Sequence, residues 1–131
     1  MITLLIDHNI EGQATLLWGA LAAEGWLELV SLRLVRFTEM GLPFDSSDRV
    51  VWRFAQAQGL LLLTDNRNMK GEDSLEQTLR EENTLNSLPI LTIGNTDRLD
   101  ERDYREQCIS RLIEIILDLE SYLGTGRLFI P

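Results

Sequence analysis

Cysteine, histidine and lysine are nearly absent from this chain, with one residue of each type, Cys108, His8 and Lys70, among 131. A single cysteine excludes an intramolecular disulfide and a zinc site built from cysteines. A single histidine likewise excludes a histidine-rich metal site. The other 11 basic residues are arginines, whose guanidinium groups make forked contacts with phosphate or carboxylate groups.

Positive charge and long apolar runs are also scarce. Twelve basic against 21 acidic residues give a formal net charge of −9, whereas a protein that binds nucleic acid or membranes non-specifically needs a basic surplus. This balance still allows a nucleic-acid enzyme that works through divalent cations. No apolar run approaches the ~18 residues of a membrane span, and Met1–Asn9 lacks the basic start of a secretory signal. We therefore expect a cytoplasmic protein with no membrane association.

The residues that are present are typical of one globular domain spanning residues 1–131. Hydrophobic residues make up 44% of the chain and charged residues 25%, which is an ordinary balance for a folded protein. A chain of this length buries roughly two-thirds of its unfolded surface and needs no disulfide or metal to fold.

Short apolar segments alternate along the chain with segments of helical periodicity. The apolar segments indicate buried strands, at Ile2–Ile6, Trp26–Val35, Leu60–Leu63 and Leu88–Ile93, with Arg127–Ile130 as a further edge strand. The helical patterns lie between them, at Gln13–Glu24, from Ser47–Asp48 to Gly59, at Ser74–Glu82 and at Arg102–Leu123. This order predicts an α/β fold, a three-layer α/β/α sandwich with a mainly parallel sheet of four to five strands.

Acidic residues stand at the predicted carboxyl edge of this sheet, where ligands bind in open parallel sheets. Asp7 follows the first strand, Asp65 follows the third, and Asp48 opens the helix before the third. Two carboxylates ~5 Å apart repel by ~3 kcal/mol at an effective dielectric constant of ~20. Three ionised carboxylates at one edge would therefore need a bound cation to offset their repulsion. Oxygen ligands favour Mg²⁺ or Mn²⁺ over zinc, and such ions activate water and stabilise phosphoryl transfer.

Three segments carry a family resemblance in their order: LLIDHN (Leu4–Asn9), SSDRVVWRFAQ (Ser46–Gln56) and LLLLTDNRN (Leu60–Asn68). This order resembles that of the small stand-alone PIN-like proteins, over roughly residues 2 to 95. PIN-like domains are α/β/α sandwiches whose acidic residues bind Mg²⁺ or Mn²⁺ and cut RNA, and many are toxins of toxin–antitoxin pairs. The resemblance therefore implies a metal-dependent endoribonuclease, with RNA as substrate and an antitoxin or another protein as partner.

The third segment departs from the family pattern, which reads T-x-D-x-D after the third strand. In strict register Asn66 and Asn68 stand at the two acidic positions, and Asp65 lies one place early. An asparagine keeps a carbonyl oxygen for a metal but loses the charge. The alternative function is therefore a PIN-like binding or regulatory module that has lost catalysis.

The resemblance implies a set of acidic site residues, and the polar and basic residues near the same edge supply candidates for substrate binding. The predicted catalytic residues and metal ligands are Asp7, Asp48 and Asp65, with Asn66 as a further ligand. The predicted substrate-binding residues are Asn9, Arg67 and Asn68, and Arg49 and Arg53 could also flank the acidic edge and hold a nucleic-acid backbone.

Plainer interpretations compete with each of these assignments. Asp7 could cap the first helix, and Asp48 could simply favour its own helix N-terminus. His8 has a pKa range suited to a general base, but a structural role is the stronger interpretation. Cys108 lies on the apolar face of its helix and is predicted to belong to the core.

Two other enzyme classes fit less well. Asp7-His8-Asn9 loosely resembles the nucleophile motif of haloacid-dehalogenase-type phosphatases, but the later lysine of that class is missing. A phosphate-receiver domain needs an acidic pair after the first strand and a lysine after the last, and neither is present. The helix at 102–123 could pack on its own sheet or on a second copy, which leaves a homodimer open.

Overall fold

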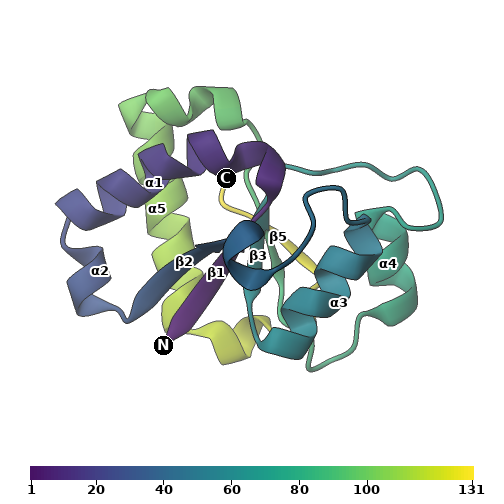
Figure 1. Ribbon diagram of the computed structural model, residues 1–131. Coiled ribbons are helices and arrows are strands. Elements are labelled where there is room, and N and C mark those ends of the chain that lie inside the picture. Colours follow the sequence, from purple (N-terminus) through teal and green to yellow (C-terminus); the bar gives the residue numbers. More distant parts are fainter.

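The computed structural model describes residues 1–131 and contains one sheet of five parallel strands. Its strands are β1 (Ile2–Ile6), β2 (Leu32–Arg36), β3 (Leu61–Thr64), β4 (Ile90–Thr92) and β5 (Arg127–Phe129). They are ordered β2-β1-β3-β4-β5 across the sheet, and every neighbouring pair is parallel (Figure 1). The predicted α/β class and parallel sheet are confirmed, and the edge strand forms as the fifth strand.

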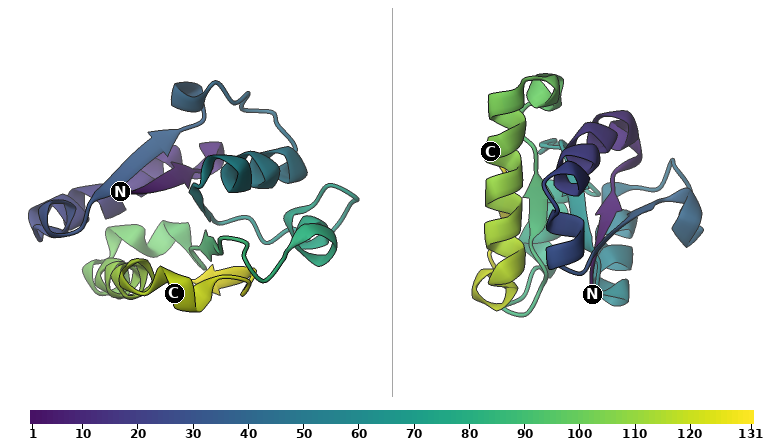
Figure 2. Two further views of the ribbon diagram at one scale, coloured as in Figure 1. Left: turned by 90° about the horizontal axis from the view of Figure 1, so that it is seen from below. Right: turned by 90° about the vertical axis from the view of Figure 1, so that its left-hand side faces the viewer.

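Helices cover both faces of the sheet and complete a three-layer α/β/α sandwich (Figure 2). The helices of one face are α1 (Glu11–Ala23), α2 (Trp26–Leu29) and α5 (Arg102–Leu117); those of the other are α3 (Asp48–Gln58) and α4 (Leu75–Glu82). Short 3₁₀ turns are η1 (His8–Ile10), η2 (Thr38–Met40), η3 (Thr96–Asp100) and η4 (Leu119–Tyr122). None of the helices has both the length and the apolar character that crossing a membrane requires.

The leucine run of β3 belongs to both hydrophobic cores. Leu61 and Leu63 pack in the larger core with α1 and α5, and Leu62 packs in the smaller core with α3 and α4. Successive side chains of a strand point to opposite faces, so a strand covered on both faces needs an apolar residue at every position. This requirement explains the uninterrupted run.

Local signals set the ends of the two helices on the smaller core. The hydroxyl of Ser47 accepts a hydrogen bond from the backbone N–H of Val50 and caps α3, and Gly59 ends that helix at a φ of +68°. Ser74 caps α4 through the backbone N–H of Gln77. The predicted start and end of α3 are confirmed, and they fix Asp48 in its first turn.

The predicted strand at Trp26–Val35 is wrong in its first half. Gly25, at a φ of +78°, ends α1 and starts the short helix α2 at Trp26–Leu29, and β2 begins only at Leu32. Trp26 and Leu27 pack against the larger core from this helix, so their apolar character serves a helical contact and not a strand.

The C-terminal helix is also shorter than predicted. α5 ends at Leu117 and the turn η4 (Leu119–Tyr122) follows, because Asp118 leaves the helical conformation at a φ of −134°. The buried side chains of α5 lie in the larger core against their own sheet. Of the two predicted arrangements, α5 therefore adopts the one in which it packs on its own sheet.

Candidate functional site

A small pocket opens where the order of the strands reverses. The chain passes from β1 to β2 on one side and then returns to β3 on the other side of β1, and ligands of such sheets bind outside the carboxyl ends at this point. The pocket has a volume of about 60 Å³. We call it the switch-point pocket; its polar lining consists of Asp7, Asn9, Ser46, Asp48, Thr64 and Asn66.

Asp7 is held in the switch-point pocket by two donors. Its Oδ2 accepts a hydrogen bond of 2.6 Å from the hydroxyl of Thr64, and its Oδ1 accepts one of 3.2 Å from the backbone N–H of Asn9. The backbone N–H of Asp7 donates to the carbonyl of Leu63 at 2.9 Å. The carboxylate therefore caps the first helical turn, as the plainer interpretation expects, and also faces the pocket.

Thr64 connects Asp7 to Asn66. Its side chain is fully buried, and its hydroxyl donates to Asp7 while accepting a hydrogen bond of 3.0 Å from the backbone N–H of Asn66. The amide oxygen of Asn66 accepts from the backbone N–H of Asn68 at 2.8 Å. A carbonyl oxygen has two lone pairs, so this oxygen can still accept a further contact inside the pocket.

Asp48 enters the same pocket from α3. It lies in the first turn of that helix, and its Oδ2 accepts a hydrogen bond of 3.2 Å from the backbone N–H of Leu75, the first residue of α4. The carboxylate is therefore near the N-termini of two helices, where helix dipoles favour a negative charge. The structure thus brings together Asp7, Asn9, Asp48 and Asn66.

Asp65 does not join these residues. Its Oδ2 accepts a hydrogen bond of 3.3 Å from the hydroxyl of Thr96, and it lines a separate hollow with Arg67, Asn95 and Asp97. We call this hollow the neighbouring pocket. Asp65 and Asn66 therefore line different pockets although they are neighbours in the sequence. No group of three or more Asp, Glu, His or Cys side chains gathers in the structure as a ready-made metal site.

The predicted substrate-binding residues are therefore split among three environments. Asn9 lines the switch-point pocket, and Arg67 lines the neighbouring pocket. Asn68 is exposed and lines neither pocket, and its amide oxygen accepts a hydrogen bond of 3.0 Å from the backbone N–H of Lys70.

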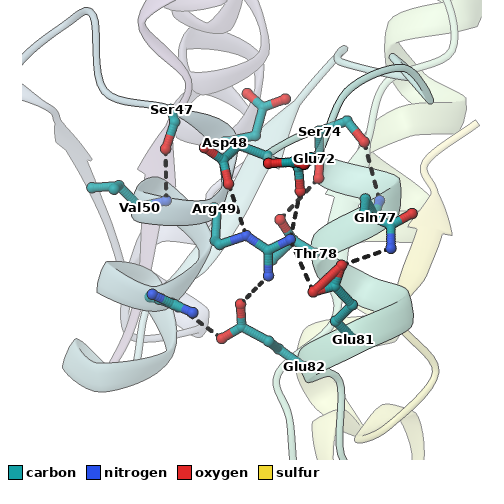
Figure 3. A network of polar contacts seen from close by, with 12 residues as sticks. Ser47, Asp48, Arg49, Val50, Glu72, Ser74, Gln77, Thr78, Glu81 and Glu82 are labelled. Carbon is teal, nitrogen blue, oxygen red and sulfur yellow. Dashed lines mark hydrogen bonds and ion pairs between the residues drawn. The ribbon is translucent and has the colours of Figure 1, made fainter.

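Arg49 and Arg53 face away from the switch-point pocket. Arg49 points from α3 toward α4, where its Nε lies 3.0 Å from Asp73 and its guanidinium pairs with Glu82 (Figure 3). Arg53 donates to the same Glu82 carboxylate at 2.7 Å. These hydrogen bonds, first from Arg53 and then from Arg49, lower the pKa of Glu82, and the bond to Glu82 raises the pKa of Arg49. Both arginines therefore join the two helices, Arg49 through several shielded contacts and Arg53 through one pair, with 61% of its side chain exposed.

Two residues that sequence reasoning missed support or border the site. Arg127 of β5 reaches across β4 and donates to the backbone carbonyl of Asn66 and to the hydroxyl of Thr92, both at 2.8 Å. Its Nε also donates to Glu76 at 2.8 Å. Phe44, in the loop before α3, lines the switch-point pocket with 71% of its surface exposed. Neither residue belongs to a motif in the sequence, so no sequence signal showed that Arg127 supports the backbone of Asn66 or that Phe44 lines the pocket.

The chain was also compared with known proteins. No family model, no curated protein and no solved structure matches it.

Proposed function

We propose that this protein is a divalent-metal-dependent endoribonuclease of the PIN-like type, with its metal site in the switch-point pocket. The observation that carries the proposal is that Asp7 and Asp48, from separate elements, line one pocket at the strand-order reversal. Asn66 supplies a third oxygen ligand from the end of β3. Asp65, which lines the neighbouring pocket, is left out of this ligand set.

The donor set and the size of the pocket fit Mg²⁺ or Mn²⁺. Mg²⁺ is commonly held by one or two carboxylates plus substrate phosphates and keeps several water ligands, so two aspartates suffice. The volume of about 60 Å³ is far below the ~300–1,000 Å³ of typical small-molecule sites. A nucleotide therefore stays outside while an ion and water fit inside. When bound, such an ion supplies an activated water and stabilises the charge of an in-line displacement.

The residues of the chain have distinct roles in this proposal. Thr64 orients Asp7, and the backbone N–H of Leu75 orients Asp48. Arg67 in the neighbouring pocket is free of ion pairs and is placed to hold a backbone phosphate.

Calorimetric titration of Mn²⁺ tests the metal site directly. We expect saturable binding by the wild-type protein, at least tenfold weaker binding by Asp7→Asn and Asp48→Asn, and unchanged binding by the matched control Asp65→Asn. Cleavage of a labelled single-stranded RNA should require Mg²⁺ or Mn²⁺ and fall by orders of magnitude in the first two variants. Equal loss of binding in Asp65→Asn would contradict the assignment of ligands.

One observation favours a second function, a PIN-like module that binds without cutting. Only two carboxylates line the switch-point pocket, and Asn66 stands where the family pattern has an acid. Metal binding without any RNA cleavage would favour this function, whereas cleavage abolished by Asp7→Asn would exclude it. For either function, an antitoxin, another protein or a second copy of the chain stays a predicted partner.

A further inference from the structure

Three rings form a row from the smaller core to the mouth of the switch-point pocket. Phe37 is buried at 3% exposure, the centroid of the His8 ring lies 6.3 Å from that of Phe37, and the centroid of the Phe44 ring lies 5.5 Å from that of His8. Both pairs are tilted, a usual geometry for interacting rings. The Nδ1 of His8 is further held 2.9 Å from Glu11. Phe44 is therefore supported from behind, although most of its own surface faces solvent.

The backbone on both sides of Phe44 is tied down. The backbone N–H of Leu42 donates to the carbonyl of Phe37 at 2.9 Å, and the hydroxyl of Ser46 donates to the carbonyl of Pro43 at 2.7 Å. Leu42 is itself buried in the smaller core. An aromatic ring that is exposed, backed by a second ring and carried by an anchored loop is prepared to stack on a flat partner.

The size of the switch-point pocket excludes a nucleobase from its interior. A hollow of about 60 Å³ has no room for a nucleobase beside a metal ion. If a backbone phosphate lies at Asp7 and Asp48, the attached base must lie outside the pocket. Phe44 lines the pocket and is also exposed to solvent, so its ring is within reach of that base. Bases stack on such rings with little dependence on their identity.

The cations near this edge are suited to a single strand. Arg67 and Lys70, in the loop after β3, form no ion pair, whereas Arg36 at the end of β2 is paired with Glu39 at 3.2 Å. Two free cations can hold one or two phosphates of one chain. A net charge of −9 is unfavourable for binding both backbones of a duplex. The bases of a duplex are also paired and stacked on each other, so they are not free to stack on a protein ring.

We infer that Phe44, backed by His8, is a stacking platform for one base of a single-stranded nucleic acid whose phosphate lies at the switch-point pocket. This inference rests on the proposed function for the position of the phosphate. It adds to that function a binding contact that is separate from the metal ligands.

Fluorescence anisotropy with two short labelled strands tests the platform. One probe is an oligoadenylate, and the other has the same length and charge but abasic sugars; Ca²⁺ replaces Mn²⁺ so that the strands are not consumed. Stacking of one base predicts that the wild-type protein binds oligoadenylate about 5- to 150-fold tighter than the abasic strand. Phe44→Leu should lose most of this preference, and Phe44→Trp should keep it. Phe129→Leu changes another exposed phenylalanine, which lines neither pocket, and should behave as the wild-type protein does.

Every outcome bears on the platform independently of catalysis. Equal binding of both probes, an unchanged preference in Phe44→Leu, or no binding of either probe would overturn it. RNA cleavage without any preference for bases would leave the nuclease proposal standing and remove the platform. A preference that depends on Phe44, in a protein that cuts no RNA, would support the platform and remove the nuclease proposal.

Discussion

At the scale of single residues, Thr64 is the side chain on which the geometry of the switch-point pocket depends most. It is fully buried, and its one hydroxyl serves both Asp7 and the backbone of Asn66. A buried polar group that loses its partner costs about 1–3 kcal/mol. Such a residue affects stability and site geometry together.

We expect Thr64→Val to lower the free energy of unfolding by about 1–3 kcal/mol and to weaken Mn²⁺ binding. Valine leaves the N–H of Asn66 without its acceptor and frees the carboxylate of Asp7 to rotate. Urea unfolding and calorimetry measure the two effects. Ser87→Ala is the control, because it removes a buried hydroxyl that accepts a hydrogen bond of 2.9 Å from the backbone N–H of Thr84, outside the pocket, and should lower stability alone. Unchanged Mn²⁺ affinity in Thr64→Val would show that Asp7 needs no orientation by Thr64.

Cys108 is the residue whose titration affects stability at alkaline pH. It is fully buried in the larger core, as its place on an apolar helix face predicts, and burial raises the pKa of its thiol to about 11. The unfolded chain ionises this thiol near pH 9 while the folded protein keeps it protonated. The contribution of this group to stability is therefore complete below pH 9 and is lost as the pH rises from 9 toward 11.

We expect the free energy of unfolding of the wild-type protein to fall more steeply between pH 9 and pH 11 than that of Cys108→Ala, because the variant has no thiol to ionise. Urea unfolding of both proteins across this range measures the difference. Parallel curves would contradict the prediction.

At the scale of elements, α3 and α4 are joined by ion pairs as well as by the smaller core. Arg49, with a side chain 13% exposed, lies within 3.3 Å of Glu81 and 3.0 Å of Asp73 and also pairs with Glu82. Several well-placed partners around one shielded guanidinium stabilise more than an isolated surface pair does. The contacts join the start of α3, which carries Asp48, to α4, whose first N–H holds that carboxylate.

Arg49→Gln should therefore reduce stability more than Arg102→Gln, which breaks an exposed pair with Glu106 at 3.0 Å on α5. The pKa of Glu82 is lowered by Arg53 and Arg49. The stability that this carboxylate contributes is present above its ordinary pKa and is lost as the pH falls through the lowered value. The difference in the free energy of unfolding between Arg49→Gln and the wild-type protein should accordingly become smaller below about pH 4. Chemical unfolding at neutral and acid pH measures the stability difference between the variants and its dependence on pH. Equal losses of stability in Arg49→Gln and Arg102→Gln would contradict the expected difference.

At the scale of the whole molecule, the net charge of −9 and the metal site proposed at Asp7 and Asp48 predict that the stability of the protein responds to cations. Salt screens the repulsion among surface charges, whereas an ion that binds the folded state at one site stabilises it by mass action, by about 2.7 kcal/mol at a hundredfold excess over its dissociation constant.

We therefore expect Mn²⁺ to raise the melting temperature of the wild-type protein well above the rise given by NaCl of equal ionic strength. Asp7→Asn should keep the effect of NaCl and lose the additional effect of Mn²⁺. Scanning calorimetry measures both. The same response to Mn²⁺ in both proteins would show that the ion acts only by screening.

The sequence by itself determined the parallel α/β architecture, the caps of α3 and the position of Asp7 and Asp48 at one edge, because burial periods and capping residues act within a few positions of the chain. It could not decide between Asp65 and Asn66. The leucine run before them is buried on both faces, so no alternation of polar and apolar residues shows which side chain faces the pocket.

Only the tertiary structure decided the contacts between distant segments. Arg127 meets the backbone of Asn66 across 61 positions of sequence, and Arg49 reaches Glu82 on the next helix. These contacts depend on strand order, register and helix placement, which result from packing the whole core at once. The residues around the switch-point pocket were therefore visible in part from local patterns, whereas the network that holds them depends on the complete fold.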